Sequence, residues 1–339
     1  MNKVNNIIRF AIIGAGRIGQ RHMNEIRANN QCLLVAIIDT NIPDDGRFGT
    51  VLPLFSSLEQ YFKSGPECDV VIIASPNGMH AEHAMECISR GLHVVIEKPM
   101  ALRSEDVKKI KDRSIQQGTL VFGVMQNRYS PVTAWLKDTV SKNILGEIYL
   151  VQICCYWNRD ERYYTKGSWH GSKLMDGGTL FTQFSHFIDL IYWIFGDIEN
   201  IDSRIYDFNH GELTEFEDCG VVSFDLVKGG IGNLNFSTAL WDQNMDSDIT
   251  VIGQHGSIKI SGQYMDTLAY CHIKDFGPPT GITGKVTSDP GKSNHKFVIQ
   301  NVVDVLLNKS LADNNLEDSF KVIEMIERIY AANRHEIIK

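Results

Sequence analysis

Hydrophobic residues in the first third of the chain come in short runs rich in β-branched side chains, separated by segments with helical periodicity. The runs predict strands at residues 7–13, 33–39, 70–74, 94–97 and 120–125. Between them, residues 81–90 and 104–117 have helical spacing, and each is followed by a glycine that can end a helix. Strands that alternate with helices and are apolar along their whole length predict a doubly wound parallel sheet.

The pattern changes after residue 126. A helix is expected at residues 131–142, and apolar and polar residues then alternate as in strands with one buried face, at residues 146–157, 219–227, 231–239, 248–253 and 257–262. Two later segments, 295–308 and 316–334, have helical periodicity and can pack on this sheet or back on the first domain. We therefore expect an α/β Rossmann domain over residues 1–126 and an α+β domain with a large, mostly antiparallel sheet over residues 127–339.

A glycine-rich motif, Gly14-Ala15-Gly16-Arg17-Ile18-Gly19, directly follows the first predicted strand. In a strand–turn–helix unit the first glycine permits a tight turn, the second lets the backbone approach a pyrophosphate, and the third lets helix and strand pack closely. The helix N-terminus then binds the phosphates. Asp39 ends the second predicted strand about 20 residues after Gly19, where a carboxylate can bind ribose hydroxyls. The alternative is an ordinary glycine turn beside a solvated aspartate.

The residues around Asp39 also bear on the choice of cofactor. Its charge would repel a 2′-phosphate, and Thr40 and Asn41 supply no adjacent cation, which favours NAD over NADP. Arg47 is near enough in sequence to leave NADP open.

In a doubly wound sheet, ligands bind beyond the carboxyl ends of the strands. The third and fourth predicted strands end in Ser75-Pro76-Asn77 and Glu97-Lys98-Pro99, so we place these residues and His80 in one crevice. A lysine there suits proton transfer beside a nicotinamide, whereas the alternative is a surface lysine at a strand end. His80 and His83 have the spacing of a metal pair, but no further ligands accompany them, so no metal is predicted.

Residues 177–195 begin with Gly177-Gly178 and continue as an apolar segment that predicts a helix with few polar side chains. Thr182, His186 and Asp189 would share one face of it, at spacings of four and three. A histidine in this setting is either a functional residue or a buried core residue whose hydrogen bonds are made within the protein.

These motifs, in this order, resemble the glucose–fructose oxidoreductase / inositol dehydrogenase / MocA (Gfo/Idh/MocA) family over essentially the whole chain. Glu97-Lys98-Pro99 with His186 is the most specific part. The resemblance implies that Lys98 and His186 are catalytic and handle the proton of a sugar or cyclitol hydroxyl. It implies a cofactor site formed by Gly14, Gly16, Arg17, Ile18, Gly19, Asp39, Ser75, Pro76, Asn77, His80, Glu97 and Lys98. The family usually has Asp or Asn where this chain has Thr182.

A narrower resemblance concerns residues 162–171, which are rich in Arg, Tyr and Trp. They are similar to a stretch in the family's nucleotide-sugar dehydrogenases, which oxidise the three-position hydroxyl of UDP-N-acetylglucosamine or its uronic acid for surface polysaccharides. The resemblance implies a substrate site formed by Arg162, Tyr163, Lys166, Trp169, Lys173, Thr182 and Asp189. The alternative is a packed loop that ties the domains together.

The charge and composition of the chain exclude some classes of binding partner. The net charge of −8 would repel a nucleic acid, and no apolar stretch is long enough to span a membrane. The seven cysteines contain no CxxC pair and are expected to be reduced thiols. We therefore expect a cytoplasmic protein with no nucleic-acid or membrane partner and, from the family resemblance, a homodimer or homotetramer.

Three functions remain open. The leading one is NAD-dependent oxidation of a secondary hydroxyl of a sugar that can be carried on UDP. The second is a free sugar or myo-inositol dehydrogenase. The third is a non-catalytic dinucleotide-binding sensor, against which the presence of both Lys98 and His186 argues.

Overall fold

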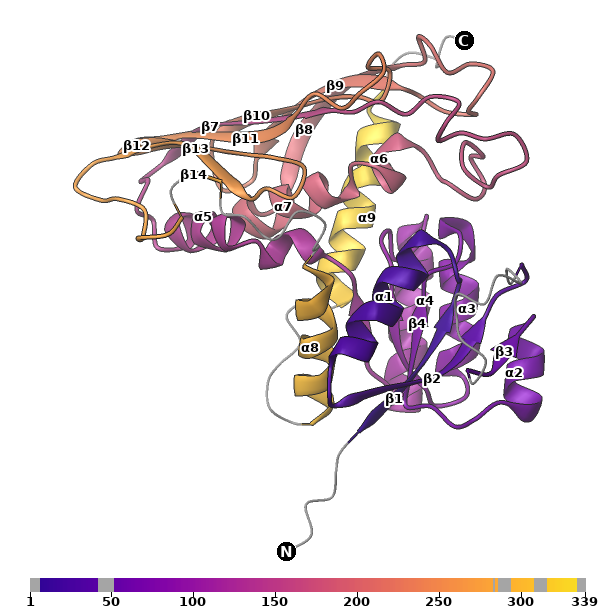
Figure 1. Cartoon of the computed structure of the whole chain (residues 1–339). Coiled ribbons are helices and arrows are strands. Elements are labelled where there is room, and N and C mark those ends of the chain that lie inside the picture. The colour runs from indigo at the N-terminus through magenta and orange to yellow at the C-terminus, as the bar shows by residue number, and fades with distance from the viewer. Residues whose placement is uncertain (1–6, 42–51, 283, 286–293, 308–315, 334–339) are drawn as a thin grey trace, which may run out of the picture. The chain divides into compact units, whose positions relative to one another are not determined.

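The computed structural model describes residues 7–41, 52–282, 284–285, 294–307 and 316–333 (Figure 1). The chain forms two compact units, residues 1–124 with 295–320, and residues 125–294 with 321–339. The expected second domain, 127–339, differs from this division because helix α8 (His295–Leu306) packs against helix α1 (Arg17–Ala28) of the first unit. The Asn29 side chain at the end of α1 donates to Gln300 Oε1 of α8 at 3.0 Å.

The first unit contains a six-stranded parallel sheet in the order β3-β2-β1-β4-β5-β6. Its strands are β1 (Ile8–Ile13), β2 (Cys32–Ile38), β3 (Leu54–Phe55), β4 (Val70–Ile73), β5 (His93–Ile96) and β6 (Val121–Gly123). All four residues of β4 are fully buried, as expected for a central strand covered on both faces. The five predicted strands and the doubly wound topology are confirmed. The two residues of β3 are too few to produce a pattern.

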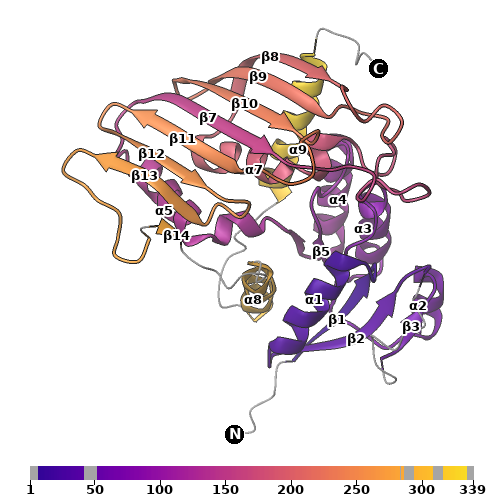
Figure 2. The same ribbon diagram turned by 45° about the horizontal axis from the view of Figure 1, so that its top comes forward.

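Helices α1, α2 (Leu58–Ser64), α3 (His80–Ile88), α4 (Ser104–Gln117) and α8 surround this sheet (Figures 1 and 2). The Ser57 hydroxyl begins α2 by accepting the Gln60 N–H. Helix α4 occupies the predicted residues and ends at Gly118, whose φ of +65° favours glycine. Arg47 lies outside the described residues.

The second unit contains an eight-stranded sheet in the order β14-β13-β12-β11-β7-β10-β9-β8. The strands are β7 (Ile148–Tyr156), β8 (Ile198–Tyr206), β9 (Cys219–Leu226), β10 (Ile231–Ser237), β11 (Ser247–Gly253), β12 (Gly256–Ser261), β13 (Thr267–Ile273) and β14 (Gly284–Lys285). All neighbours are antiparallel except β7 and β10, which are parallel. The predicted mostly antiparallel sheet is therefore confirmed.

In strands β8 and β13 of this sheet, apolar and polar residues do not alternate regularly. The register between β8 and β9 shifts between Glu199 and Asp202, and the register between β12 and β13 shifts between Lys259 and Ile260. A shift in register changes which side chains face the core, so the two-residue period is lost. This accounts for the absence of β8 and β13 from the predicted strands.

Helices α5 (Pro131–Ser141), α7 (Ser185–Phe195) and most of α9 (Leu316–Ala331) lie against one face of the large sheet (Figure 2). Aromatic side chains contribute to this core. The Phe184 ring, just before α7, lies 5.7 Å from that of Phe236 on β10 and 5.1 Å from that of Trp157. Within the part of the chain that the structure describes, no helix is both long and apolar enough to span a membrane.

Candidate functional site

The glycine-rich motif forms the turn between β1 and α1, and its three glycines have different surroundings. Gly14 has a φ of +98°, and a Cβ there would lie 2.3 Å from the Ala74 carbonyl oxygen. A Cβ on Gly19 would lie 1.9 Å from the Gly14 carbonyl oxygen. A Cβ on Gly16 would meet no other atom within 4 Å. The motif therefore combines close backbone packing with open space at the start of α1, which fits a pyrophosphate.

Asp39 lies beside this turn, directly after β2. Its carboxylate accepts the N–H of Ala15 at 2.5 Å and that of Asn41 at 2.7 Å. These bonds attach the end of β2 to the glycine-rich turn. The carboxylate is therefore oriented next to the phosphate-binding backbone, where the ribose of a dinucleotide is recognised.

His80 is fully buried and contacts two turns that follow neighbouring strands. Its Nε2 lies 2.8 Å from the Ser75 carbonyl oxygen and its Nδ1 lies 2.7 Å from that of Pro99. The Ser75 hydroxyl in turn lies 2.9 Å from His83 Nδ1. Burial lowers the pKa of His80, and the hydrogen bonds to the Pro99 and Ser75 carbonyl oxygens oppose that effect. The two strand ends that carry Ser75 and Lys98 are thus held by a common side chain.

Lys98 is half-buried in the turn after β5, and the peptide bond to Pro99 is cis. The preceding Glu97 is buried, and its Oε2 accepts the Lys98 backbone N–H at 3.1 Å. Arg17 is exposed, Ile18 and Pro76 are half-buried, and Asn77 is buried. Their participation in cofactor binding stays a prediction.

His186 lies in the first turn of α7 and is 7% exposed. Its Nε2 lies 3.0 Å from Nε2 of Gln126, a residue of the short 3-10 helix Gln126–Tyr129. The orientation of the Gln126 amide and the tautomer of the ring together decide which of the two side chains donates this bond. A neutral imidazole can take up a proton from a substrate.

Asp189 lies one turn after His186 and forms a buried ion pair. Arg128 Nη2 and Nε donate to its carboxylate at 2.5 and 2.9 Å, and both side chains are at most 5% exposed. The guanidinium carbon also lies 5.3 Å from the centre of the Trp193 ring. Sequence reasoning missed Arg128, although its position in a polar stretch directly after an apolar strand was a usable signal.

The segment that follows Gly177-Gly178 is two helices rather than the single helix expected. Helix α6 (Thr179–Thr182) ends before Gln183, and α7 begins at Ser185. Thr182 and His186 therefore do not share one continuous helical face. The Thr182 hydroxyl instead donates to Asp176, to its carbonyl oxygen at 2.7 Å and to its carboxylate.

Asp176 is fully buried, and its other carboxylate oxygen accepts the Gly171 N–H at 2.8 Å. This side chain thus joins the end of the Arg/Tyr/Trp-rich stretch to α6. The sequence offered no signal for it, because a buried aspartate looks like a solvated one until its partners are known.

The Arg/Tyr/Trp-rich stretch is ordered by contacts among its own side chains. The ring of His170 stacks on Trp169 at 3.9 Å and meets Tyr163 edge-on at 4.6 Å. Tyr163 also accepts a hydrogen bond from Gln183 at 2.9 Å. Arg159, which sequence reasoning missed, donates to Gln183 Oε1 at 2.8 Å and lies over the Tyr163 ring.

The predicted substrate cations differ in their surroundings. Arg162 is paired with Asp160 at 2.6 Å and with Asp242 at 3.3 Å, so much of its charge is balanced within the loop. The side chains of Lys166 and Lys173 are exposed.

Comparison with protein families gives two adjoining matches. Residues 8–124 match the oxidoreductase family Gfo/Idh/MocA, NAD-binding Rossmann fold, and residues 133–259 match the Gfo/Idh/MocA C-terminal domain.

Among solved structures, the WlbA dehydrogenase of Bordetella pertussis in complex with NADH and UDP-GlcNAcA is 28% identical with a TM-score of 0.91, and the match covers 97% of this chain and 96% of that one. The WlbA dehydrogenase of Chromobacterium violaceum, also in complex with NADH and UDP-GlcNAcA, is 26% identical with a TM-score of 0.88. This match covers 98% of this chain and 95% of that one. A curated relative, the scyllo-inositol 2-dehydrogenase (NADP(+)) of Bacillus subtilis, is 31% identical over 39% of this chain and 36% of that enzyme. The match therefore covers little more than a third of that relative.

Proposed function

Because the chain belongs to the Gfo/Idh/MocA family of oxidoreductases with an NAD-binding Rossmann domain, we propose that it oxidises the three-position hydroxyl of a UDP-linked sugar, UDP-N-acetylglucosaminuronic acid or UDP-N-acetylglucosamine. The observation that carries this proposal is the similarity, through both units, to dehydrogenases bound to NADH and UDP-GlcNAcA. The free-polyol alternative is supported by the match to an inositol dehydrogenase over part of the chain.

The residues of the first unit fit NAD. The open space at Gly16 leaves the N-terminus of α1 accessible to a pyrophosphate, and Asp39 offers a carboxylate to the ribose hydroxyls. NAD, when bound, accepts the hydride that the alcohol carbon loses. The side chains of this protein then have to bind and orient the sugar and move its hydroxyl proton.

Substitution of Asp39 tests how the cofactor is recognised. We expect Asp39→Ala to weaken NADH binding about 10- to 100-fold, because a hydrogen bond to a charged group contributes about 1.5–3 kcal/mol. NADPH binding should be less affected, because the charge that repels a 2′-phosphate is removed. Fluorescence titration with both cofactors measures the two effects. Asp39→Asn is the matched control, since it keeps an acceptor for the Ala15 N–H. Equal losses for NADH and NADPH would show that Asp39 supports only the glycine-rich turn.

Oxidation of a secondary alcohol requires a base for the hydroxyl proton and a positive charge that stabilises the developing alkoxide. We assign these two tasks to Lys98 and His186. The ammonium group of Lys98 can supply the charge, and the imidazole of His186 can accept the proton. Gln126 orients the His186 ring, and the buried pair of Arg128 and Asp189 supports the helix that carries it.

The Arg/Tyr/Trp-rich stretch has the side chains that a UDP-sugar requires. The half-buried Trp169 presents an aromatic surface for stacking, and the exposed ammonium groups of Lys166 and Lys173 suit a diphosphate. A free sugar or inositol carries neither a base nor a diphosphate. These side chains therefore favour the nucleotide-linked substrate.

Ligand binding to the NAD-saturated protein tests the substrate class. We would measure thermal stabilisation by UDP-N-acetylglucosaminuronic acid, UDP-N-acetylglucosamine, UDP, glucose and myo-inositol at equal concentrations, because stabilisation follows the ratio of concentration to dissociation constant. The proposal predicts a shift with the UDP-sugars and none with the free polyols. The double variant Lys166→Gln/Lys173→Gln should lose most of that shift, whereas the exposed control Lys142→Gln, directly after α5, should keep it. A shift with glucose or inositol alone would establish the free-polyol alternative instead.

A further inference from the structure

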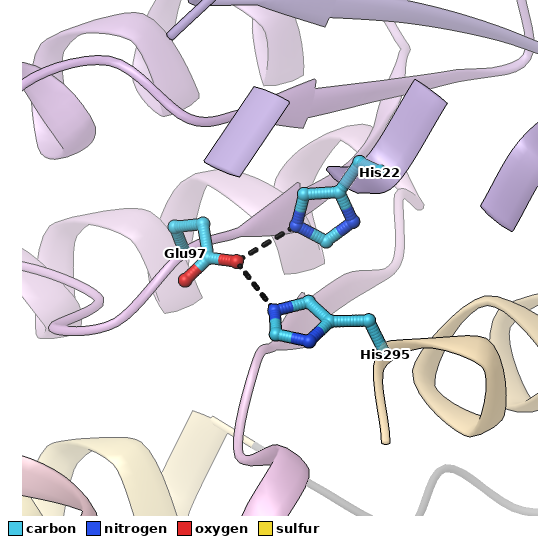
Figure 3. Close-up of side chains that lie close together, drawn as sticks. All are labelled: His22, Glu97 and His295. Carbon is cyan, nitrogen blue, oxygen red and sulfur yellow. Dashed lines mark hydrogen bonds and ion pairs between the residues drawn. The ribbon is translucent and has the colours of Figure 1, made fainter. Parts of the chain in front are cut away.

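Three buried side chains of the first unit meet at a single carboxylate oxygen, and we call them the His22–Glu97–His295 cluster (Figure 3). Glu97 Oε1 lies 2.7 Å from His22 Nε2 and 3.3 Å from His295 Nε2. None of the three residues is more than 5% exposed. His22 belongs to α1, Glu97 follows β5 and His295 begins α8, so the cluster joins elements that are far apart in the sequence.

The cluster keeps Glu97 ionised. Burial alone would favour the neutral acid, but the hydrogen bonds from His22 and His295 hold the pKa of this carboxyl well below its usual range. Burial lowers the pKa of His295, against the opposing effect of Glu97. An ionised carboxylate only accepts hydrogen bonds, so each ring donates to it through Nε2.

The same three ligand atoms lie within 4.8 Å of one another, which raises the question of a metal ion. Two observations favour a hydrogen-bonded cluster. Both ring nitrogens lie within hydrogen-bond distance of the same oxygen. In addition, Nδ1 of His22 is buried with no partner among the described residues, whereas a metal-binding histidine almost always donates its second N–H to an acceptor.

The second carboxylate oxygen of Glu97 accepts a hydrogen bond from the backbone of Lys98, the residue assigned to catalysis. Oε2 accepts the backbone N–H of Lys98 at 3.1 Å, while the Glu97 backbone N–H donates to the Ile73 carbonyl oxygen at 3.0 Å. One carboxylate is therefore bonded on one side to α1 and α8 and on the other to the backbone that carries Lys98. We propose that Glu97 is a positioning residue for Lys98, and that His22 and His295 act on Lys98 through Glu97.

This inference depends on the proposed function only for the task that Lys98 performs. It explains why a helix from the C-terminal part of the chain packs in the first unit: α8 brings His295 to Glu97. The Glu97 carboxylate accepts hydrogen bonds from the two imidazoles and the Lys98 N–H, and the cofactor-binding role that the sequence motif implied for it stays a prediction.

Four variants of the full-length protein test the proposal. Glu97→Gln removes the charge, and His295→Leu removes one donor. His295→Gln is the conservative variant, because its amide nitrogen can reach a position close to that of Nε2. Gln300→Leu is the matched control, because it removes the other hydrogen bond between α1 and α8, to Asn29, without touching the cluster.

The first measurement needs no turnover. The rate at which acetic anhydride acylates Lys98 would be followed by mass spectrometry, with and without NAD, relative to the exposed Lys109. We expect Glu97→Gln and His295→Leu to change this relative rate about threefold or more, and Gln300→Leu to leave it within about 1.5-fold. His295→Gln should restore most of the wild-type rate.

The second measurement separates kcat from KM with UDP-N-acetylglucosaminuronic acid and NAD. Glu97→Gln and His295→Leu should lower kcat about 10- to 100-fold, the range that a displacement of about 1 Å can cause, with KM for NAD within about threefold.

Two results would overturn the proposal. In the first, Glu97→Gln and His295→Leu change the acylation rate of Lys98 and kcat no more than Gln300→Leu does, with all variants equally stable to unfolding. The cluster would then be purely structural. In the second, the wild type retains one equivalent of Zn²⁺ through dialysis and His295→Leu loses it. The cluster would then be a metal site. If the wild type does not oxidise this sugar, the substrate proposal fails, while the labelling still decides the role of Glu97.

Discussion

Substitution of Lys98 by methionine is expected to lower kcat for oxidation of UDP-N-acetylglucosaminuronic acid about 10²- to 10³-fold, the range that loss of one group stabilising an oxyanion causes. Methionine keeps much of the length of the side chain but can neither carry a proton nor stabilise an alkoxide. NADH binding should change by less than about threefold, since cofactor affinity depends mainly on the glycine-rich turn and Asp39. Stopped-flow absorbance of NADH formation and fluorescence titration measure the two quantities separately.

Controls make this result specific to the catalytic assignment. Lys109→Met, at an exposed position of α4, should leave kcat unchanged. His186→Gln should cause a loss of similar size, and the double variant should lose much less than the product of the two effects if the residues act as a unit. A Lys98→Met enzyme that keeps more than about a third of the wild-type kcat would remove Lys98 from the mechanism.

Removal of the guanidinium group at position 128 is expected to cost about 3–5 kcal/mol of folding stability. Arg128→Met breaks a buried ion pair and leaves the Asp189 carboxylate, only 1% exposed, without its cation. Methionine fills a similar volume beside Trp193, so the loss should come from the uncompensated charge rather than from a cavity. The urea dependence of far-ultraviolet circular dichroism measures it.

Two further variants distinguish this explanation from a general sensitivity of the second unit. Arg128→Met/Asp189→Leu should recover most of the lost stability, because replacing a buried pair by apolar side chains is often neutral. Arg162→Met, which removes an exposed ion pair with Asp160, should cost no more than about 1 kcal/mol. A loss below about 1 kcal/mol for Arg128→Met would show that water or a nearby group solvates Asp189.

The sequence predicted strands best where burial is uniform. The run Val70–Ile73 is apolar at every position because helices cover both faces of its sheet, and it was predicted at its observed start. The strand Ile198–Tyr206 was missed because a register shift interrupts its alternation, and the strand Leu54–Phe55 because it is too short. The helix at residues 295–306 was predicted, but its packing partner was left open, because an apolar face does not name the surface that covers it.

In the candidate site, the residues of a local sequence motif were predicted and the contacts between distant residues were not. Gly14, Gly16, Gly19 and Asp39 belong to a local motif whose backbone geometry depends on neighbouring residues, and the structure places them together. Contacts between distant residues were not foreseen. Arg128 with Asp189 and Glu97 with His295 are paired by tertiary packing, and a single residue in a sequence does not reveal its distant partner.

The most direct test of the proposed function is a single-turnover reaction with UDP-N-acetylglucosaminuronic acid deuterated at carbon 3, using protein in excess over the sugar and in the presence of NAD. Protein in excess makes the reaction visible even if the cofactor stays bound between turnovers. The proposed function predicts one deuterium transferred to the cofactor as deuteride for each sugar oxidised, and a 3-keto product by mass spectrometry. Reduced cofactor without deuterium, or reduction by myo-inositol or glucose but not by this sugar, would contradict it.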